Sequence, residues 1–483
     1  MSTSAARCSV PAVAIVGGGL AGVAAALAAA ERGLRVELFE ARRVLGGRAA
    51  SFRDPASGEW IDLCQHVSMG CCTNLADFCR RAGIAQHFAR HRRLHVIGPD
   101  GRRHDVAAAG WLPAPLHLLP SLLALEHLSL RERWHLLGTL GRLARRRPCA
   151  DAVDQPIGPW LLEQGESDRA IREFWSPVLV GALSETLEHA SLSAARQVFL
   201  DGFLASRRAY ELEIPKSPLA EVFGHGVADC LGARGVTIHL GSRVQRIEGD
   251  RHGVREMLAS GQTTARFDFY VAAVPWHAVR GLFGPGLREA LPMLEGAARL
   301  QPAPITAVHL WFDRPITPLA HAILPGGLSQ WLFQHAGGRC QVVISASRGL
   351  AGRRRGEIVA QVQAELARAF SAAARARLVR WRVITQGAAV FSVRPGSGAH
   401  RPAQHTPVPN LMLAGDWTAT GWPGTMEGAV RSGYLAVEAI LRALGRPEHV
   451  VVPDLPRGVL ARWLIGPRTT AASPGQPGSF TAQ

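Results

Sequence analysis

The chain has 483 residues, of which 47% are hydrophobic and 19% charged, and Lys+Arg 54 against Asp+Glu 38 gives a formal net charge of +16. This composition excludes an intrinsically disordered chain, and the length allows two or three domains with buried cores. Because the arginines are spread along the chain in short groups, the positive charge predicts no nucleic-acid partner.

Cysteine usage and hydropathy favour a reduced, intracellular chain. None of the eight cysteines has histidines at the spacing of a zinc site, so we expect no metal centre. We interpret Cys64 to Cys79 as core side chains. No stretch approaches the ~20 apolar residues that span a bilayer, and no signal peptide precedes the first strand. We therefore expect a cytoplasmic protein that contacts the inner face of the cell membrane only peripherally.

The first predicted elements form a strand–turn–helix–strand unit. Residues 12–16 are a continuous apolar run, which is typical of a parallel strand buried on both faces. A glycine-rich turn follows, then an alanine-rich helix, then a strand over 35–40. Such a turn lets a pyrophosphate approach the helix N-terminus, and an acid ending the second strand can bind ribose. The expected nucleotide contacts here are Gly17, Gly19, Leu20, Ala21, Gly22 and Glu40.

The following elements alternate between strands and helices. Further strands are predicted at 59–62, 237–240, 243–248, 253–258, 267–274, 305–312, 340–347 and 411–414, with a hairpin turn at Gly249-Asp250. Helices are predicted at 74–82, 157–203, 219–234 and 356–370, and a long one opens at Thr425. Residues 111–147 have a leucine-rich helical pattern that three prolines interrupt, with a basic exit. The segment beyond 467 has the composition of a disordered tail.

Two segments remote from the first glycines distinguish FAD from NAD. Gly46-Gly47-Arg48 follows the second strand, where the extended pyrophosphate of FAD would lie. Gly415-Asp416 ends a strand near the other end of the chain, with a carboxylate suited to a ribityl hydroxyl. The helix at Thr425 would direct its N-terminal amides at the flavin. FAD is therefore the predicted cofactor, with further contacts from Gly46, Gly47, Arg48, Val244, Gly415, Asp416, Thr425, Met426, Glu427 and Ala429.

These motifs resemble the flavin amine oxidase and phytoene desaturase superfamily, over residues 12 to 445. Narrower stretches are similar to the hydroxysqualene dehydroxylases. They are Glu59-Trp60-Ile61-Asp62-x-x-Gln65-His66, Gly70-Cys71-Cys72, Trp175-Ser176-Pro177, Leu310-Trp311-Phe312-Asp313-Arg314-Pro315 and Gln330-Trp331-Leu332-Phe333. The sequence departs from that pattern at Leu63-Cys64, where Asn-Gly is expected.

The resemblance implies an α/β fold, in which a discontinuous Rossmann-type FAD-binding domain carries an inserted α+β substrate domain. We assign 10–100, 216–290 and 405–446 to the FAD-binding domain. The substrate domain then comprises 101–215 and 291–404, with 111–147 as a membrane-facing helical segment. Residues 467–483 are the expected disordered tail.

The resemblance also implies a reaction, the reduction of hydroxysqualene to squalene by hydride from FADH2 in hopanoid or triterpenoid biosynthesis. The partners implied are a C30 isoprenoid substrate and other enzymes of the squalene pathway. Asp62 and His66 are candidate proton donors, each with a structural role as the alternative. Trp417 and Trp422 could stabilise an allylic cation through their ring faces, or could simply pack.

Three other functions remain open from the sequence. A carotenoid or phytoene desaturase shares the fold and the apolar tunnel but transfers hydride in the opposite direction. A flavin amine oxidase usually has a tyrosine where this chain has Thr425, and a lysine near 305–312, whereas Lys216 is the only lysine here. The third alternative is a non-catalytic, lipid-binding scaffold, which would lack the flavin absorbance band.

Overall fold

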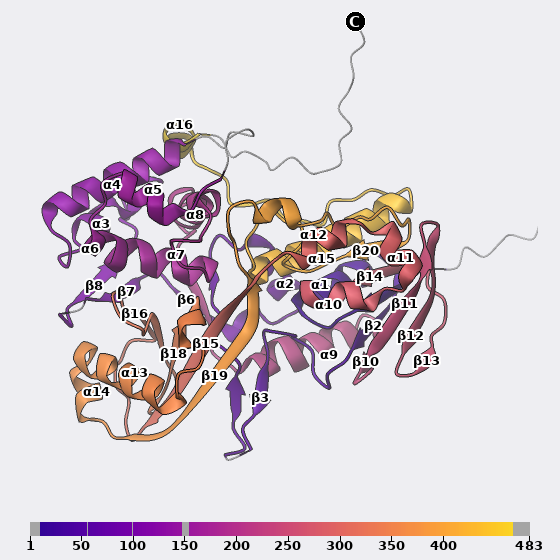
Figure 1. Cartoon of the computed structure of the whole chain (residues 1–483), viewed down its shortest axis with the longest axis horizontal. Helices are drawn as coiled ribbons and strands as arrows, with labels where there is room; N and C mark the ends of the chain where they lie inside the picture. Colours follow the sequence, from indigo (N-terminus) through magenta and orange to yellow (C-terminus); the bar gives the residue numbers. More distant parts are fainter. Residues whose placement is uncertain (1–9, 56, 99, 147–153, 467–483) are drawn as a thin grey trace, which may run out of the picture.

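The computed structural model describes residues 10–55, 57–98, 100–146 and 154–466. The tail predicted at 467–483 lies outside these ranges. Figure 1 shows an α/β region at one end of the molecule and, at the other, a group of helices beside a long twisted sheet.

A parallel sheet of five strands forms the core of the α/β region. Its order is β10 (Thr237–Leu240), β2 (Arg35–Glu40), β1 (Ala12–Val16), β14 (Phe269–Ala272) and β20 (Leu411–Leu413). Every neighbouring pair is parallel. The strands come from widely separated parts of the chain, and the sheet confirms the predicted α/β class.

Layers cover both faces of this sheet, and alternate residues of β1 face each layer. Val13 and Ile15 pack against a helical layer, and Ala14 and Val16 pack against a mixed layer. The helical layer contains α1 (Leu20–Ala30), α2 (Thr73–Arg81), η5 (Ala220–Gly226), α9 (Val227–Gly232) and α15 (Met426–Ala443). The mixed layer contains β11 (Val244–Asp250), β12 (Gly253–Ala259), β13 (Gln262–Thr263), α10 (Trp276–Leu282), α11 (Pro285–Ala290) and α12 (Met293–Ala298).

The hairpin turn predicted at Gly249-Asp250 is wrong by two residues. Both residues belong to β11, and the turn is made by Arg251 and His252. The register of the two strands shifts at Gly249, where a Cβ atom would lie 2.2 Å from the carbonyl oxygen of Gly253. The glycine therefore marks a bulge inside the strand, which a sequence pattern does not distinguish from a turn.

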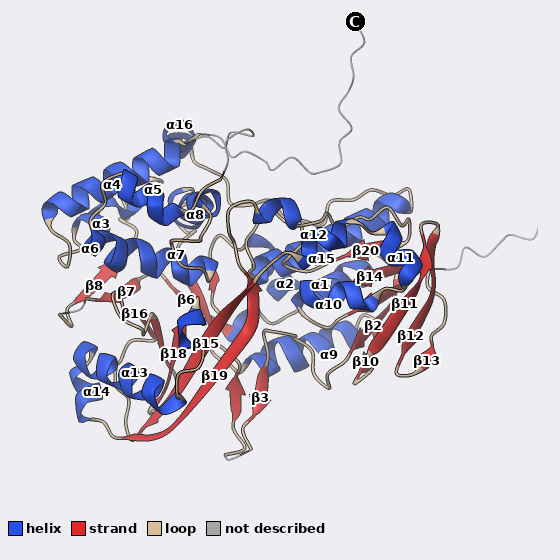
Figure 2. Cartoon of the chain, viewed as in Figure 1, coloured by secondary structure: helices blue, strands red, loops and turns tan. Residues whose placement is uncertain are grey.

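A second sheet of seven strands lies beside the first region. Its order is β19 (Leu378–Phe391), β15 (Pro302–Phe312), β18 (Arg339–Ile344), β17 (Trp331–Gln334), β16 (His321–Ile323), β7 (Leu94–Ile97) and β8 (Arg103–Val106). Its neighbours are antiparallel except β16 and β7. Figure 2 shows β15 and β19 as the long strands that reach toward the α/β region. Helices α13 (Arg355–Ala369) and α14 (Ser371–Arg375) pack on one face.

Helices form a separate layer next to this sheet. They are α3 (Leu119–Leu123), α4 (Leu130–Arg145), α5 (Ile157–Glu163), α6 (Asp168–Ala170), η3 (Ile171–Trp175), α7 (Ser176–Leu183), α8 (Leu192–Phe199), η4 (Leu200–Leu204) and α16 (Val459–Ile465). Ser129 and Glu132 form a capping box at the start of α4. Within the described ranges, no helix is long and apolar enough to cross a membrane.

Short elements connect these layers. The strands are β3 (Ser51–Arg53), β4 (Trp60–Asp62), β5 (Ser68–Met69), β6 (Phe88–His91) and β9 (Leu212–Pro215), and the short helices are η1 (Ala85–His87), η2 (Leu116–Leu118), η6 (Ser347–Leu350) and η7 (Ser397–His400). β3 pairs with β4, and β9 pairs with both β5 and β6.

Candidate active site

One cavity of about 1060 Å³ runs from the ends of the parallel strands into the space between the helices and the second sheet. This volume lies at the upper end of the ~300–1,000 Å³ range of small-molecule pockets, so the cavity can hold a large ligand. The predicted residues that line it are Gly17, Gly19, Leu20, Ala21, Glu40, Gly46, Gly47, Arg48, His66, Val244, Gly415, Asp416, Trp417, Trp422, Thr425, Met426, Glu427 and Ala429. Gly22 and Asp62 are outside the lining.

The turn between β1 and α1 has the form of a phosphate cradle. Gly17 adopts φ +111, and a Cβ atom there would lie 2.5 Å from the carbonyl oxygen of Ala273. A Cβ on Gly22 would lie 1.8 Å from the oxygen of Gly17, so Gly22 permits packing and not contact with a ligand. Gly19 is the N-cap residue of α1, and no side chain accepts a hydrogen bond from the first turn of the helix. The N–H groups of that turn are therefore available to an anion. The residues present therefore fit a pyrophosphate.

Glu40 is held in place by the backbone around it. Its carboxylate accepts hydrogen bonds from the N–H of Gly18 at 2.6 Å and of Arg42 at 2.8 Å. The side chain is buried at the cavity wall. Each carboxylate oxygen retains a lone pair, so the predicted contact with ribose hydroxyls is compatible with this geometry.

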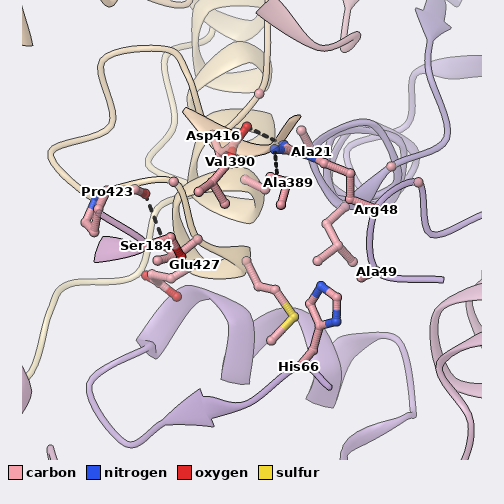
Figure 3. A pocket seen from close by; sticks show the side chains of 18 of the residues that line it. Ala21, Arg48, Ala49, His66, Ser184, Ala389, Val390, Asp416, Pro423 and Glu427 are labelled. Atoms are coloured by element: carbon pink, nitrogen blue, oxygen red, sulfur yellow. Dashed lines mark hydrogen bonds and ion pairs between the residues drawn. The ribbon is translucent and has the colours of Figure 1, made fainter. Parts of the chain in front are cut away.

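An ion pair joins the two remote nucleotide segments. Arg48 Nη2 lies 2.5 Å from Asp416 Oδ1, and Arg48 Nη1 donates to the carbonyl of Ala389 at 2.8 Å (Figure 3). Because Asp416 is buried, this pair fixes the second segment against the first and against β19. Asp416 therefore compensates the charge of Arg48 within the protein, while Arg48 still lines the cavity.

The predicted contacts at the start of α15 divide into two kinds. Thr425 caps the helix through its hydroxyl, which accepts from the N–H of Gly428 at 3.1 Å. Glu427 turns toward α2, where it accepts from the N–H of Leu75 at 2.8 Å and from Asn74 Nδ2 at 2.9 Å. Burial raises the pKa of this carboxyl. The carboxylate of Glu427 thus anchors α2, and the residue takes part in the cavity only as part of its lining.

His66 faces the cavity as a neutral imidazole. Its Nδ1 lies 2.9 Å from the carbonyl oxygen of Cys64, which can only accept, so Nδ1 carries the proton and Nε2 has the lone pair. Burial lowers the pKa of His66, and the charge of Arg48 adds to that shift. A neutral ring whose one proton is already donated is poorly suited to act as an acid. We therefore retain His66 as a hydrogen-bond acceptor.

Asp62 does not meet the expectation of a proton donor. Its Oδ1 accepts from the hydroxyl of Ser51 at 2.6 Å and from the N–H of Leu219 at 3.0 Å, and its side chain lies off the cavity. Burial raises its pKa, against the effect of these hydrogen bonds. The carboxylate therefore holds the start of the 219–232 helical segment.

Asp62→Ala is expected to lower the free energy of unfolding by about 2 kcal/mol, because a buried N–H and a hydroxyl lose their acceptor. Asp62→Asn, which keeps an acceptor oxygen, is expected to lose less. Urea titrations of both variants measure this, together with the flavin content of the folded fraction. If Asp62→Asn lost turnover while its stability was unchanged, Asp62 would have a role in the reaction itself.

Both tryptophans proposed as cation stabilisers are engaged in packing. Trp417 is fully buried, and its Nε1 donates to the carbonyl of Val274 at 3.0 Å. The ring of Trp422 lies 5.7 Å from the guanidinium of Arg431. A second cation at Trp422 would be repelled by this arginine, so we assign neither ring to the stabilisation of a carbocation.

The far part of the cavity is mainly apolar, and the sequence did not predict which residues form its walls. Its walls include Val178, Val198, Phe203, Leu212, Ile305, Ile323, Trp331, Phe333 and Val343. Polar side chains interrupt these walls, among them Ser184, Ser345 and Gln386, and Ser68, Gln197 and Asp201 also line the cavity. We consider the first three together. They come from three separate elements, and no spacing in the sequence links them. Among the described residues no group of His, Cys, Asp and Glu could hold a metal ion.

Comparison with known proteins agrees with this geometry. A family model described as flavin containing amine oxidoreductase matches residues 20–441. Hydroxysqualene dehydroxylase from Rhodopseudomonas palustris is 28% identical over 445 residues, which cover 89% of this chain and 98% of the relative. 15-cis-Phytoene desaturase from Synechococcus elongatus is 24% identical over 470 residues, 90% of this chain and 98% of the relative. The solved structure of cyclohexylamine oxidase from Brevibacterium oxydans shares the fold, with a TM-score of 0.66 and 21% identity over 90% of this chain and 100% of that one.

Proposed function

The chain belongs to the flavin-containing amine oxidoreductases, its cofactor is FAD, and from this premise we propose that it reduces hydroxysqualene to squalene. Reduced FAD, when bound, supplies a hydride and a proton, so that the allylic alcohol becomes the hydrocarbon and water. The protein must hold the alcohol carbon beside the flavin and keep solvent away. The residues that would hold the cofactor are those of the phosphate cradle, Glu40, and the segments 46–48 and 415–429.

The observation that carries this proposal is the continuity of the cavity. The nucleotide end leads directly into an apolar compartment walled by residues such as Phe203, Ile305 and Phe333. A long hydrocarbon chain would gain ~25 cal/mol for each Å² of apolar surface that it buries there. The curated relatives named for hydroxysqualene and for phytoene support an isoprenoid of this kind.

A substitution of His66 tests whether this side chain only accepts a hydrogen bond from the hydroxyl that leaves or also donates a proton to it. Because its neutral ring offers one acceptor, His66→Leu is expected to lower kcat/KM by about 10-fold, the value of one hydrogen bond. A fall of about 100-fold or more, with loss of an ionisation from the pH profile, would identify a general acid instead. His277→Leu, in α10 outside the cavity lining, is the matched control.

Phytoene desaturation is the second candidate, because relatives with that name match the chain at comparable identity and coverage. Amine oxidation has less support. Thr425 stands where a tyrosine is expected, and Ile305 and its neighbours in β15 include no lysine.

A paired anaerobic assay separates these reactions. Protein with photoreduced FAD is mixed with hydroxysqualene, and protein with oxidised FAD is mixed with phytoene. Squalene in the first vessel and no flavin bleaching in the second supports dehydroxylation. Bleaching with phytoene and no squalene would establish desaturation, and neither product would reject both substrates.

We also propose peripheral contact of the helical layer with a lipid surface. Trp111 and Trp134 are 78% and 63% exposed, and Arg131 lies beside the exposed Leu130 at the start of α4. Exposed aromatic and aliphatic side chains next to arginines suit an anionic membrane interface. Co-sedimentation with anionic vesicles, compared with Trp134→Ser, measures this contact, and equal sedimentation of both proteins would contradict it.

A further inference from the structure

Three neutral polar side chains lie on the wall of the apolar compartment. Ser184 follows α7, Ser345 follows β18, and Gln386 lies in β19. The two serines are only 6% and 5% exposed. Within the described ranges, the structure gives neither hydroxyl a hydrogen-bond partner. Buried hydroxyls usually have a partner, so these two are expected to find it in a ligand.

The strand register brings two of these side chains to either side of one residue. Ile305 is opposite Gln386, and the next residue of β15, Thr306, is opposite Ile344. Ser345 follows Ile344, so it continues the row past Ile305 on the other side. Gln386, Ile305 and Ser345 all line the cavity.

An ion pair ties Ser184 to the same place. Its neighbour Glu185 is fully buried and lies 2.6 Å from Arg348 Nη1, in the turn that follows Ser345. Glu185 also accepts from the hydroxyl of Ser392, next to β19. The carboxylate therefore joins the end of α7 to both strands and fixes the loop that carries Ser184.

The backbone at this place is strained. Ser184 has φ +53 and Ala346 has φ +51, and Ser260 is the other non-glycine residue with positive φ among those described. At the end of a helix such as α7 the left-handed position normally belongs to glycine. Strain that persists at a cavity wall is typical of a functional site, and here it orients a hydroxyl that glycine lacks.

We propose that Ser184, Ser345 and Gln386 form a subsite that binds the hydroxyl group of a neutral isoprenoid alcohol. All three groups both donate and accept, as an alcohol does, and none carries a charge. A hydrocarbon would leave them unpaired, and an ammonium group would gain no ionic partner from the three. The carboxylates nearby already have cationic partners, since Glu185 is paired with Arg348 and Asp201, which also lines the cavity, is paired with Arg457. The inference rests on the proposed function in so far as this alcohol is the hydroxyl removed in the reaction.

The test measures ligand binding to the holoprotein with oxidised FAD. Binding is detected as a change in the flavin absorbance. The probes are farnesol, its hydrocarbon counterpart farnesene, and farnesylamine. The wild type is expected to bind farnesol at least about 10-fold more tightly than either analogue, because the analogues leave buried polar groups unpaired.

The variants separate the role of the hydroxyls from that of the fold. Ser184→Gly, Ser345→Ala and Gln386→Leu are each expected to weaken farnesol binding by about 3- to 10-fold and to leave farnesene binding unchanged. Ser184→Gly should also raise the melting temperature, because it removes the strain. Ala346→Gly relieves strain without removing a hydroxyl, and Ser329→Ala removes a buried hydroxyl outside the cavity lining, so both should bind farnesol as the wild type does.

Equal binding of farnesol and farnesene by the wild type, or a parallel loss of both in the variants, would overturn the subsite. The outcome is distinguishable from that of the proposed function, because binding does not require turnover. Farnesol preference without squalene formation would reject the reaction alone. Squalene formation with variants that retain farnesol affinity would reject the subsite alone.

Discussion

Gly19→Ala is expected to yield a folded protein whose affinity for FAD is about 100-fold lower, a loss of ~2.7 kcal/mol in binding free energy. Gly19 has φ −75, which any residue adopts, and the nearest atom to a Cβ there is Gly47 Cα at 3.8 Å. The methyl group therefore fits the protein itself. It occupies the space where a pyrophosphate must approach the N–H groups of α1.

The measurement is the flavin absorbance near ~450 nm of purified protein, together with titration of the apoprotein with FAD. Gly232→Ala, in α9, is the control, because nothing lies within 4 Å of a Cβ at that position. Its flavin content should equal that of the wild type. Full occupancy of Gly19→Ala would place the pyrophosphate away from this turn, and unfolding of the variant would show that the cradle has less room than its geometry indicates.

Mild acid is expected to destabilise the protein by about 5 kcal/mol between pH 6.5 and 5.5. Burial lowers the pKa of His309 and His321 to about 3 and that of His117, His127 and His335 to about 4. Their pKa in the unfolded chain is ~6.5, so below that pH the unfolded state binds more protons than the folded state. Each histidine then removes ~1 kcal/mol over this pH unit, and the five losses add. A typical domain has only ~5–15 kcal/mol of stability.

Urea titrations at pH 7.5, 6.5 and 5.5 measure this loss. His309→Leu is expected to reduce the pH-dependent part by about 1 kcal/mol, since one buried imidazole no longer titrates. His252→Gln, at an exposed turn, should leave it unchanged. A free energy of unfolding that is flat across this range would mean that the histidines become protonated inside the folded protein.

The parts of the fold that were predictable are those with local signals. The strand at 12–16 is a continuous apolar run. The glycines Gly17 and Gly22 after it are required because a Cβ atom at either position would clash with the backbone. The helix from Thr425 has both a capping residue and an apolar face. These features depend on neighbours within a few residues, so they can be read from the sequence alone.

The contacts that escaped prediction join distant residues. Arg48 and Asp416 are 368 positions apart, and no local pattern indicates that one compensates the other. β7 lies within 10–100, which we assigned to the nucleotide domain, yet it pairs with β16 of the second sheet. Asp62 is close to His66 in sequence, but strand geometry turns its carboxylate toward Leu219 and away from the cavity.

The order of the strands in the parallel sheet has a consequence for the synthesis of the protein. β14 is flanked by β1, which is made before it, and by β20, which is made about 140 residues after it. Gly17 and Gly415 are separated by about 400 residues, so at ~5–20 residues per second the second half of the cofactor site follows the first by ~20–80 s. β14 and β20 are separated by about 140 residues, so for ~7–28 s of that interval the edge of β14 has no partner and remains open to pairing with other chains. Translation rate and chaperone supply should therefore affect how much holoprotein a cell accumulates.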